Sequence, residues 1–240
     1  MKQTLRLAKI LSGLAFILLV LLIMSCKNKD QVVENIDNES SESIRYLALG
    51  DSYTIGQGVE EAFRWPNQLG DSLAALAYTL DTVAIIAQTG WTTANLLQAI
   101  ENANPSGYNL VSLLIGVNNQ YQGQDVGIFQ NEFDSLLEIS IALAHSVNRV
   151  FVVSIPDYGV TPFGSSNSEV IGQEIDLYNA YIAERCAAQA IPFINITEIS
   201  RALGDNPGAL APDNLHPSGT QYSEWVGAIL PVVVELLGNE

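Results

Sequence analysis

Short, nearly continuous apolar runs alternate with longer segments of helical periodicity from residue 45 onward. Strands that are buried on both faces have such continuous apolar sequences, and strands that alternate with helices usually pair in parallel. The expected strands are residues 46–50, 83–87, 110–116, 150–155 and 192–196. The alternation therefore predicts a three-layer α/β/α domain built around a five-stranded parallel sheet.

Between these runs, apolar residues recur every three or four positions, which places them on one face of a helix. The five expected helices carry the sets Leu69, Leu73 and Leu76; Leu96, Leu97 and Ile100; Phe129, Phe133, Leu136 and Leu143; Ile171, Ile175, Tyr178 and Ile182; and Tyr222, Val226, Ile229 and Val233. Pro217 suits the first turn of the last helix, and Pro231 is expected to kink it. Most of these apolar side chains are expected in the core.

Residues 1–25 have the features of a secretory signal peptide. Lys2, Arg6 and Lys9 give a basic start, and an apolar run follows over residues 10–24. The run has about 15 residues, fewer than the roughly 20 that span a bilayer as a helix, so a cleaved signal is favoured over an uncleaved anchor.

A sequence that resembles a bacterial lipobox closes this run: Ile23, Met24, Ser25 and Cys26. The resemblance implies acylation of Cys26 as the first mature residue, with chains such as palmitate; the alternative is an ordinary signal peptide with a chance cysteine. Residues 26–44 are expected to be the lipidated cysteine and a flexible tether, and residues 45–240 the folded domain. We therefore expect an exported bacterial lipoprotein, held on a membrane and facing the periplasm or the cell surface.

The chain is strongly acidic, with a formal net charge of −16 at pH 7. Nucleic acid is excluded as a partner, because phosphate binding needs basic patches that this chain cannot assemble. Two distant histidines and two distant cysteines match no metal-ligand spacing, so no metal site is expected. Once Cys26 is lipidated, Cys186 has no disulfide partner, and its helical setting predicts a small buried residue rather than a nucleophile.

The residue types of a serine hydrolase stand near the two ends of the domain. Ser52 follows the first strand, and Asp213 precedes His216 by three residues. A serine hydroxyl attacks carbonyls poorly unless an imidazole removes its proton and a carboxylate holds that imidazole in one tautomer. The other histidine, His145, closes a helix and precedes a strand, so it is expected at the opposite edge of the sheet, in a surface or capping role.

Four fragments lie beyond strand ends or just ahead of the last helix, in this order: Gly50-Asp51-Ser52, Thr89-Gly90-Trp91, Gly116-Val117-Asn118-Asn119 and Asp213-Asn214-Leu215-His216. Parallel sheets carry their functional loops at the carboxyl ends of the strands. In this combination the sequence resembles the GDSL, or SGNH, hydrolase family over residues 45–237. The resemblance implies a flavodoxin-like fold and a serine esterase or lipase.

The resemblance also implies a role for each site residue. Ser52 would be the nucleophile, His216 the general base and then acid, and Asp213 the partner of the imidazole. The oxyanion hole would consist of the N–H groups of Ser52 and Gly90 and the side-chain amide of Asn118. No cofactor is implied. The implied substrates are short- to medium-chain acyl esters of a sugar, a lysolipid or a small alcohol.

Two positions depart from the family pattern. Asn119 stands where Asp is common, and Tyr53 stands where Leu is common. Neither position moves a proton, so the departures bear on substrate fit. Asp51 is expected to hold the nucleophile turn, and Asp157 is a rival partner for His216.

The remaining expectations concern the pocket and the reaction. Residues 158–169 are expected to overhang the site and shape the acyl pocket, with a plain surface loop as the alternative. Trp65 and Trp91 are candidates either for pocket walls or for the core. Two other functions stay open: acyl transfer from Ser52 to a sugar hydroxyl of a glycan, and a non-catalytic surface binding lipoprotein, which the complete set of site residues disfavours.

Overall fold

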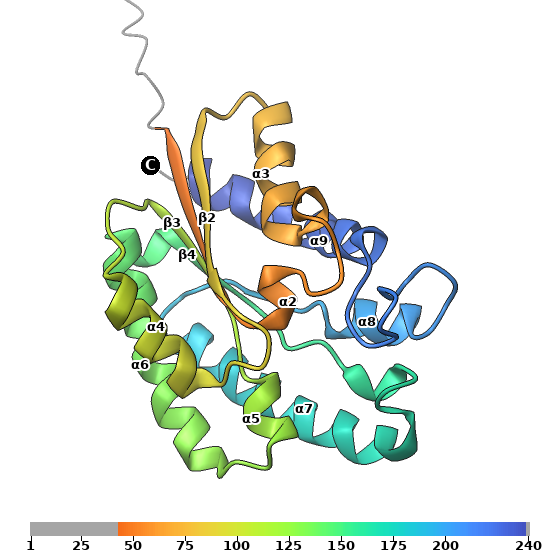
Figure 1. Cartoon of the computed structure of the whole chain (residues 1–240). Coiled ribbons are helices and arrows are strands. Elements are labelled where there is room, and N and C mark those ends of the chain that lie inside the picture. The colour runs from red at the N-terminus through yellow and green to blue at the C-terminus, as the bar shows by residue number, and fades with distance from the viewer. Residues whose placement is uncertain (1–42, 239–240) are drawn as a thin grey trace, which may run out of the picture. The chain divides into compact units, whose positions relative to one another are not determined.

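The computed structural model of the chain describes residues 43–238 (Figure 1). The predicted signal peptide, Cys26 and most of the predicted tether lie outside these residues. Five parallel strands form one sheet in the order β2-β1-β3-β4-β5. Their bounds are Ile44–Gly50 for β1, Leu80–Ala87 for β2, Leu110–Leu114 for β3, Val150–Val153 for β4 and Phe193–Ile194 for β5. The predicted α/β class and the five-stranded parallel sheet are confirmed.

The strand ends differ from the prediction by a few residues, and at the ends of β4 and β5 side chains take over backbone hydrogen bonds. Strand β4 stops at Val153, and the N–H of Ile155 donates instead to Oδ1 of Asn179 at 2.8 Å. Strand β5 spans two residues, and the N–H of Ile196 donates to Oγ of Ser154 at 2.8 Å. These polar replacements sit where the chain leaves the sheet, as loops at a strand end require.

Helices cover both faces of the sheet (Figure 1). Helices α3 (Trp65–Ala75) and α9 (Gly219–Gly238) pack together on one face, and α4 (Thr93–Ala103) and α6 (Val126–Ala144) cover the other. Helix α7 (Ser168–Ala188) packs on α6 and β5, and α8 (Thr197–Leu203) packs on α9. The five long helices match the five predicted ones.

The predicted apolar faces form the core. Phe129, Phe133, Ile175 and Ile229 are fully buried, whereas Leu76, at the end of α3, is exposed. Helix α9 begins at Gly219, so Pro217 lies just ahead of it rather than in its first turn, while Pro231 lies inside it. Among the helices of residues 43–238, none has the length and apolar character needed to cross a bilayer.

Two short helices begin where strands end and so define the functional edge of the sheet. Helix α2 (Ser52–Ile55) follows β1, and α5 (Val117–Tyr121) follows β3. His145 lies elsewhere: it is the exposed residue that ends α6, with the left-handed φ of 58° that is common in helix caps. The capping role predicted for His145 is confirmed.

Candidate active site

A tight turn between β1 and α2 presents Ser52. Asp51 caps the helix, because its Oδ1 accepts the N–H of Tyr53 at 3.0 Å. At the other end of α2, Gly56 adopts the left-handed conformation and donates its N–H to the carbonyl of Ser52. Both contacts hold the turn, so Ser52 keeps one position at the end of the strand.

Asp51 is fully buried, and burial raises its pKa to about 7 despite the hydrogen bond from Tyr53. Its second oxygen, Oδ2, makes no hydrogen bond within the described part of the chain. A buried carboxyl group without a second partner favours the protonated form. The expected structural role of Asp51 at the nucleophile turn agrees with this geometry.

A second tight turn brings Asp213 and His216 together. The N–H of Ala211 donates to the carbonyl of His216 at 2.7 Å, which closes the turn, and Asn214 adopts a left-handed φ of 58° within it. Across this turn Oδ2 of Asp213 lies 2.7 Å from Nδ1 of His216. The bond to Nδ1 leaves Nε2 as the imidazole nitrogen available to a substrate.

The carboxylate of Asp213 is itself fixed by the backbone. Its Oδ1 accepts the N–H groups of Leu215 and His216, each at 3.0 Å. Partial burial alone would raise the pKa of Asp213, but the hydrogen bonds from His216 and from these N–H groups lower it below the usual value. Asp213 therefore remains charged at neutral pH and holds the ring in one orientation.

Gly90 and Asn118 lie on loops that follow β2 and β3. Gly90 has a φ of +83°, and a Cβ added there would have no neighbour within 4 Å, so its backbone faces open space. The Nδ2 of Asn118 donates to the carbonyl of Trp91 at 2.9 Å. A side-chain amide has two N–H donors, and this bond uses one of them while orienting the group.

Asn119 ties these two loops together, a role that the sequence interpretation missed. It is fully buried, its Oδ1 accepts the N–H of Thr93 at 3.1 Å, and its Nδ2 donates to Oγ1 of Thr93 at 2.6 Å and to Oε1 of Gln124 at 3.0 Å. Oγ1 of Thr93 donates in turn to Glu132 at 2.5 Å, so it needs a donor from Asn119. A carboxylate has no hydrogen to give, which explains Asn in place of the common Asp.

The sequence-predicted residues meet in one pocket. Its volume is about 130 Å³, and its lining is Ser52, Tyr53, Thr89, Gly90, Val117, Asn118, Tyr121, Tyr158, Phe163, Leu215 and His216. Asp213 lies outside this lining and reaches the pocket through His216. The structure thus brings together a hydroxyl, an imidazole and amide donors from four loops.

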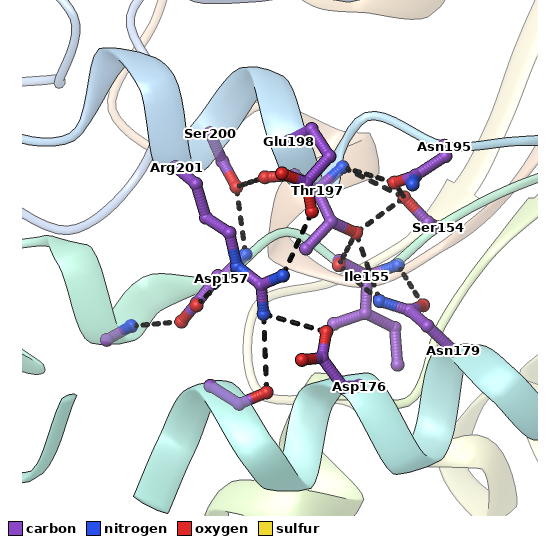
Figure 2. A network of polar contacts seen from close by, with 12 residues as sticks. Ser154, Ile155, Asp157, Asp176, Asn179, Asn195, Thr197, Glu198, Ser200 and Arg201 are labelled. Carbon is purple, nitrogen blue, oxygen red and sulfur yellow. Dashed lines mark hydrogen bonds and ion pairs between the residues drawn. The ribbon is translucent and has the colours of Figure 1, made fainter. Parts of the chain in front are cut away.

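Asp157 does not contact His216; it belongs to a separate polar network around α8 (Figure 2). Its Oδ2 binds Nε of Arg201 at 2.9 Å, and its Oδ1 accepts the N–H of Gly159 at 2.8 Å. Both carboxylate oxygens are occupied, so Asp157 is no partner for the imidazole. The sequence contained no signal for this pair, because 44 positions separate Asp157 from Arg201.

Three further candidates are settled by burial. Trp65 is fully buried in the core, and Trp91 packs against the core and contributes its carbonyl to Asn118 rather than its ring to the pocket lining. Cys186 is fully buried, and burial raises the pKa of its thiol to about 12. A buried thiol with such a pKa is not a nucleophile at neutral pH, in agreement with the expectation.

Comparison with known proteins points to one family. The model of the GDSL-like Lipase/Acylhydrolase family matches residues 48–223, which include the nucleophile turn and the Asp213–His216 turn. Among curated proteins, none matches this sequence significantly.

Solved structures with the same fold include TesA, a lipase and a phospholipase. TesA aligns with a TM-score of 0.62 and 18% identity, over 80% of this chain and 98% of that chain. An extracellular lipase from Streptomyces rimosus aligns with a TM-score of 0.61 and 19% identity, over 81% of this chain and 100% of that one. Phospholipase A1 from Streptomyces albidoflavus NA297 aligns with a TM-score of 0.59 and 21% identity, over 79% and 98%. At these identities the likeness concerns the fold.

Proposed function

The chain belongs to the GDSL-like lipase/acylhydrolase family and is therefore a carboxylic ester hydrolase, and we propose that it works through an acyl-enzyme formed on Ser52. One observation carries the proposal. Ser52, Gly90, Asn118 and His216 line the same pocket, and Asp213 holds His216 by a 2.7 Å contact. A nucleophile, a base and oxyanion donors can then act on one substrate carbonyl.

In the first half of the proposed reaction, Oγ of Ser52 attacks the ester carbonyl while Nε2 of His216 takes its proton. The N–H groups of Ser52 and Gly90 and the amide of Asn118 donate to the negative oxygen that forms. When the intermediate collapses, the bond to the alcohol breaks and His216 returns the proton to the leaving oxygen. The acyl group remains on Ser52 as an ester.

In the second half, His216 removes a proton from water, and the resulting hydroxide attacks the acyl-enzyme. The same donors bind the second negative oxygen, and the free acid leaves as Ser52 regains its proton. Because the hydrogen bonds of Asp213 lower its pKa, a negative charge faces the imidazolium in both steps.

The test uses p-nitrophenyl acetate and butyrate with purified wild type, Ser52→Ala and His216→Ala. Each variant is expected to lose at least about a thousandfold in kcat, since the two groups act as one unit. His145→Asn is the matched control: it replaces the other histidine, which caps α6, and keeps wild-type turnover. Equal turnover by wild type and Ser52→Ala would overturn the proposal.

Water, rather than a sugar hydroxyl, is proposed as the acyl acceptor. Incubation with p-nitrophenyl butyrate and candidate sugars should therefore yield free butyrate. Acylated sugar as the main product would redirect the function to acyl transfer.

We also propose that the hydrolase domain, residues 45–240, is exported and anchored through a lipid on Cys26. The basic start, the apolar run and the lipobox-like residues before Cys26 support this. Metabolic labelling with a radioactive fatty acid should mark the wild type and leave Cys26→Ala unlabelled. Equal labelling of both proteins would contradict the anchor.

A further inference from the structure

Three aromatic side chains from two separate segments meet on one side of the catalytic pocket. Tyr121 is the last residue of α5, and Tyr158 and Phe163 lie between β4 and α7. Their ring centroids are 6.1 Å apart for Tyr121 and Tyr158, 5.9 Å for Tyr121 and Phe163, and 6.3 Å for Tyr158 and Phe163. All three line the pocket that contains Ser52 and His216. We call these three residues the aromatic wall.

The space between the wall and the catalytic groups is small. The pocket volume is about 130 Å³, whereas sites for drug-sized ligands usually have about 300–1,000 Å³. A short acyl group would occupy much of such a pocket, and a fatty acyl chain would have to extend beyond it.

Next to the wall, a hydrogen bond joins the neighbouring residue Gln120 to helix α7. Nε2 of Gln120 donates to Oε2 of Glu174 at 2.6 Å, which joins α5 to α7. Burial raises the pKa of the Tyr158 phenol, a hydrogen bond with Gln120 lowers it, and the charge of Glu174 raises it. Gln120 and Glu174 therefore lie next to Tyr158. Gln120, Glu174 and Leu177 line a second hollow of about 330 Å³, whose lining differs from that of the catalytic pocket.

The outer side of the wall faces solvent. Tyr121 is 58% exposed and Phe163 is 50% exposed. A chain that grew past the wall on this side would extend into water, where an added methylene buries little surface and adds little to binding.

A charged network around Arg201 holds Asp157, the residue directly before Tyr158 (Figure 2). The guanidinium of Arg201 binds Asp157 at 2.9 Å, Asp176 at 2.8 Å and Glu198 at 3.0 Å. Asp157 directly precedes Tyr158 and accepts the N–H of Gly159 at 2.8 Å. Asp157 is buried and bonded to Arg201 on α8, so this arginine holds the start of the segment that carries Tyr158.

We propose that the aromatic wall restricts the enzyme to esters of short acyl chains, about two to four carbons long in a pocket well below the usual size of ligand sites, with Arg201 positioning the wall. This specificity rests on the proposed function. Tyr121, Tyr158 and Phe163 contact the acyl group, whereas Arg201 acts through Asp157.

The test measures kcat/KM for p-nitrophenyl esters from acetate to octanoate, each below its critical micelle concentration. A methylene that becomes fully buried raises kcat/KM by about fourfold, so the wild-type profile should stop rising at about butyrate and fall towards octanoate. Phe163→Ala removes one ring of the wall, and the space left by the ring, beside Tyr121 and Tyr158, can take about two methylenes that would otherwise turn out into water, so the octanoate-to-acetate ratio should rise by about tenfold. The matched control Phe63→Ala, which truncates an aromatic side chain of similar exposure (51%) outside this pocket, should leave the ratio unchanged.

The role of Arg201 is tested with a second matched pair. Arg201→Gln breaks the bond to Asp157, and Arg185→Gln breaks a comparable bond to Asp134 at 2.7 Å between α7 and α6. Arg201→Gln should shift the chain-length profile, whereas Arg185→Gln should leave the profile as in wild type. The octanoate-to-acetate ratio is a readout that loss of stability alone does not change, and thermal unfolding of both variants confirms that they are folded at the assay temperature.

The outcomes separate this inference from the proposed function. A wild-type profile that rises through octanoate, or a ratio in Phe163→Ala equal to that of wild type, would overturn the short-chain wall while ester hydrolysis stands. A profile in Arg201→Gln identical to wild type would overturn the positioning role. If wild type and Ser52→Ala cleave all esters equally, the proposed function itself fails.

Discussion

The substitution Asn119→Asp replaces the buried side-chain amide of Asn119 by a carboxylate. The hydrogen bonds of this amide to Thr93 and Gln124 join the loops that carry Gly90 and Asn118, and we call them the Asn119 tie. Asn119 is fully buried and gives both amide hydrogens away, to Thr93 at 2.6 Å and to Gln124 at 3.0 Å. Aspartate keeps an acceptor for the N–H of Thr93 but has no hydrogen for the other two bonds. The substitution therefore has almost no steric effect; it removes two donors and, when ionised, adds a buried charge.

The expected cost follows from these contacts. The buried hydroxyl of Thr93, left without its donor, costs about 1–3 kcal/mol, whereas Oε1 of Gln124 is only partly buried and can bind water instead, so the lost bonds lower the free energy of unfolding by about 1–3 kcal/mol. Glu132, which binds the same hydroxyl of Thr93, places a second carboxylate near the new one and adds repulsion. Because the tie joins the loops of Asn118 and Gly90, misplaced donors should lower kcat by up to about a hundredfold.

The deficit should also depend on pH. Burial and Glu132 raise the pKa of the new carboxyl group in the folded state above its unfolded value. Its unfavourable effect is then smallest below the unfolded pKa, where both states are protonated, grows as pH rises from the unfolded to the folded pKa, and is constant above the folded pKa. Urea unfolding and p-nitrophenyl butyrate hydrolysis at pH 5 and pH 8 measure both effects.

Asn109→Asp is the matched control for this experiment. Asn109 lies at the amino end of β3, bonded to Arg45 and to the carbonyl of Ser43, and is only partly buried. The same chemical change there should cost less than about 1 kcal/mol and leave kcat unchanged. If Asn119→Asp matches wild type in unfolding and in kcat at pH 8, the tie does not hold the oxyanion loops.

Three other substitutions test the site. Burial raises the pKa of Asp51 to about 7, so the folded protein keeps a proton that the unfolded chain releases, and stability falls by up to about 1.4 kcal/mol per unit as pH rises from about 4 to 7. Asp51→Asn removes this pH dependence. In urea unfolding, the free energy of unfolding of the variant minus that of wild type should therefore rise from pH 4 to pH 8, and parallel pH profiles of the two proteins would refute the reasoning. Asp213→Asn should lower kcat by about ten-thousandfold, because an amide does not stabilise the imidazolium, and near-normal kcat would exclude Asp213 as the partner of His216. The added methyl group of Gly90→Ala meets no neighbouring atom, but the backbone φ there is +83°, so the free energy of unfolding should fall by only about 1–2 kcal/mol. If the N–H of Gly90 donates to the oxyanion, kcat should fall by about a hundredfold, which is more than this loss of stability explains; an unchanged kcat would remove Gly90 from the oxyanion hole.

The fold was accessible from the sequence because its strands are buried on both faces. Such strands are continuous apolar runs, and the five predicted runs correspond to the five strands of the sheet. Their exact ends were not accessible. Strands β4 and β5 end where Asn179 and Ser154 take over backbone hydrogen bonds, and these side chains lie 24 and 42 positions away along the chain.

The meeting of Ser52, Gly90, Asn118 and His216 in one pocket followed from the same logic. A parallel sheet brings the carboxyl ends of its strands to one edge, so residues just beyond those ends become neighbours whatever their distance in sequence. The Asp213–His216 pair is local, three residues apart, and a single turn is enough to form it.

The supporting contacts are of another kind. These contacts depend on how one helix is rotated and placed against its neighbours. They include the bond between Asp157 and Arg201, the bond between Asn119 and Thr93, and the contact of Tyr121 with Tyr158. No periodicity in the chain records such placement, because many side chains at these positions would satisfy the same apolar pattern. The sequence alone determined the parallel sheet and the chemistry gathered at its edge. Only tertiary packing decided which polar groups hold that chemistry in place and how much room an acyl chain has beside it.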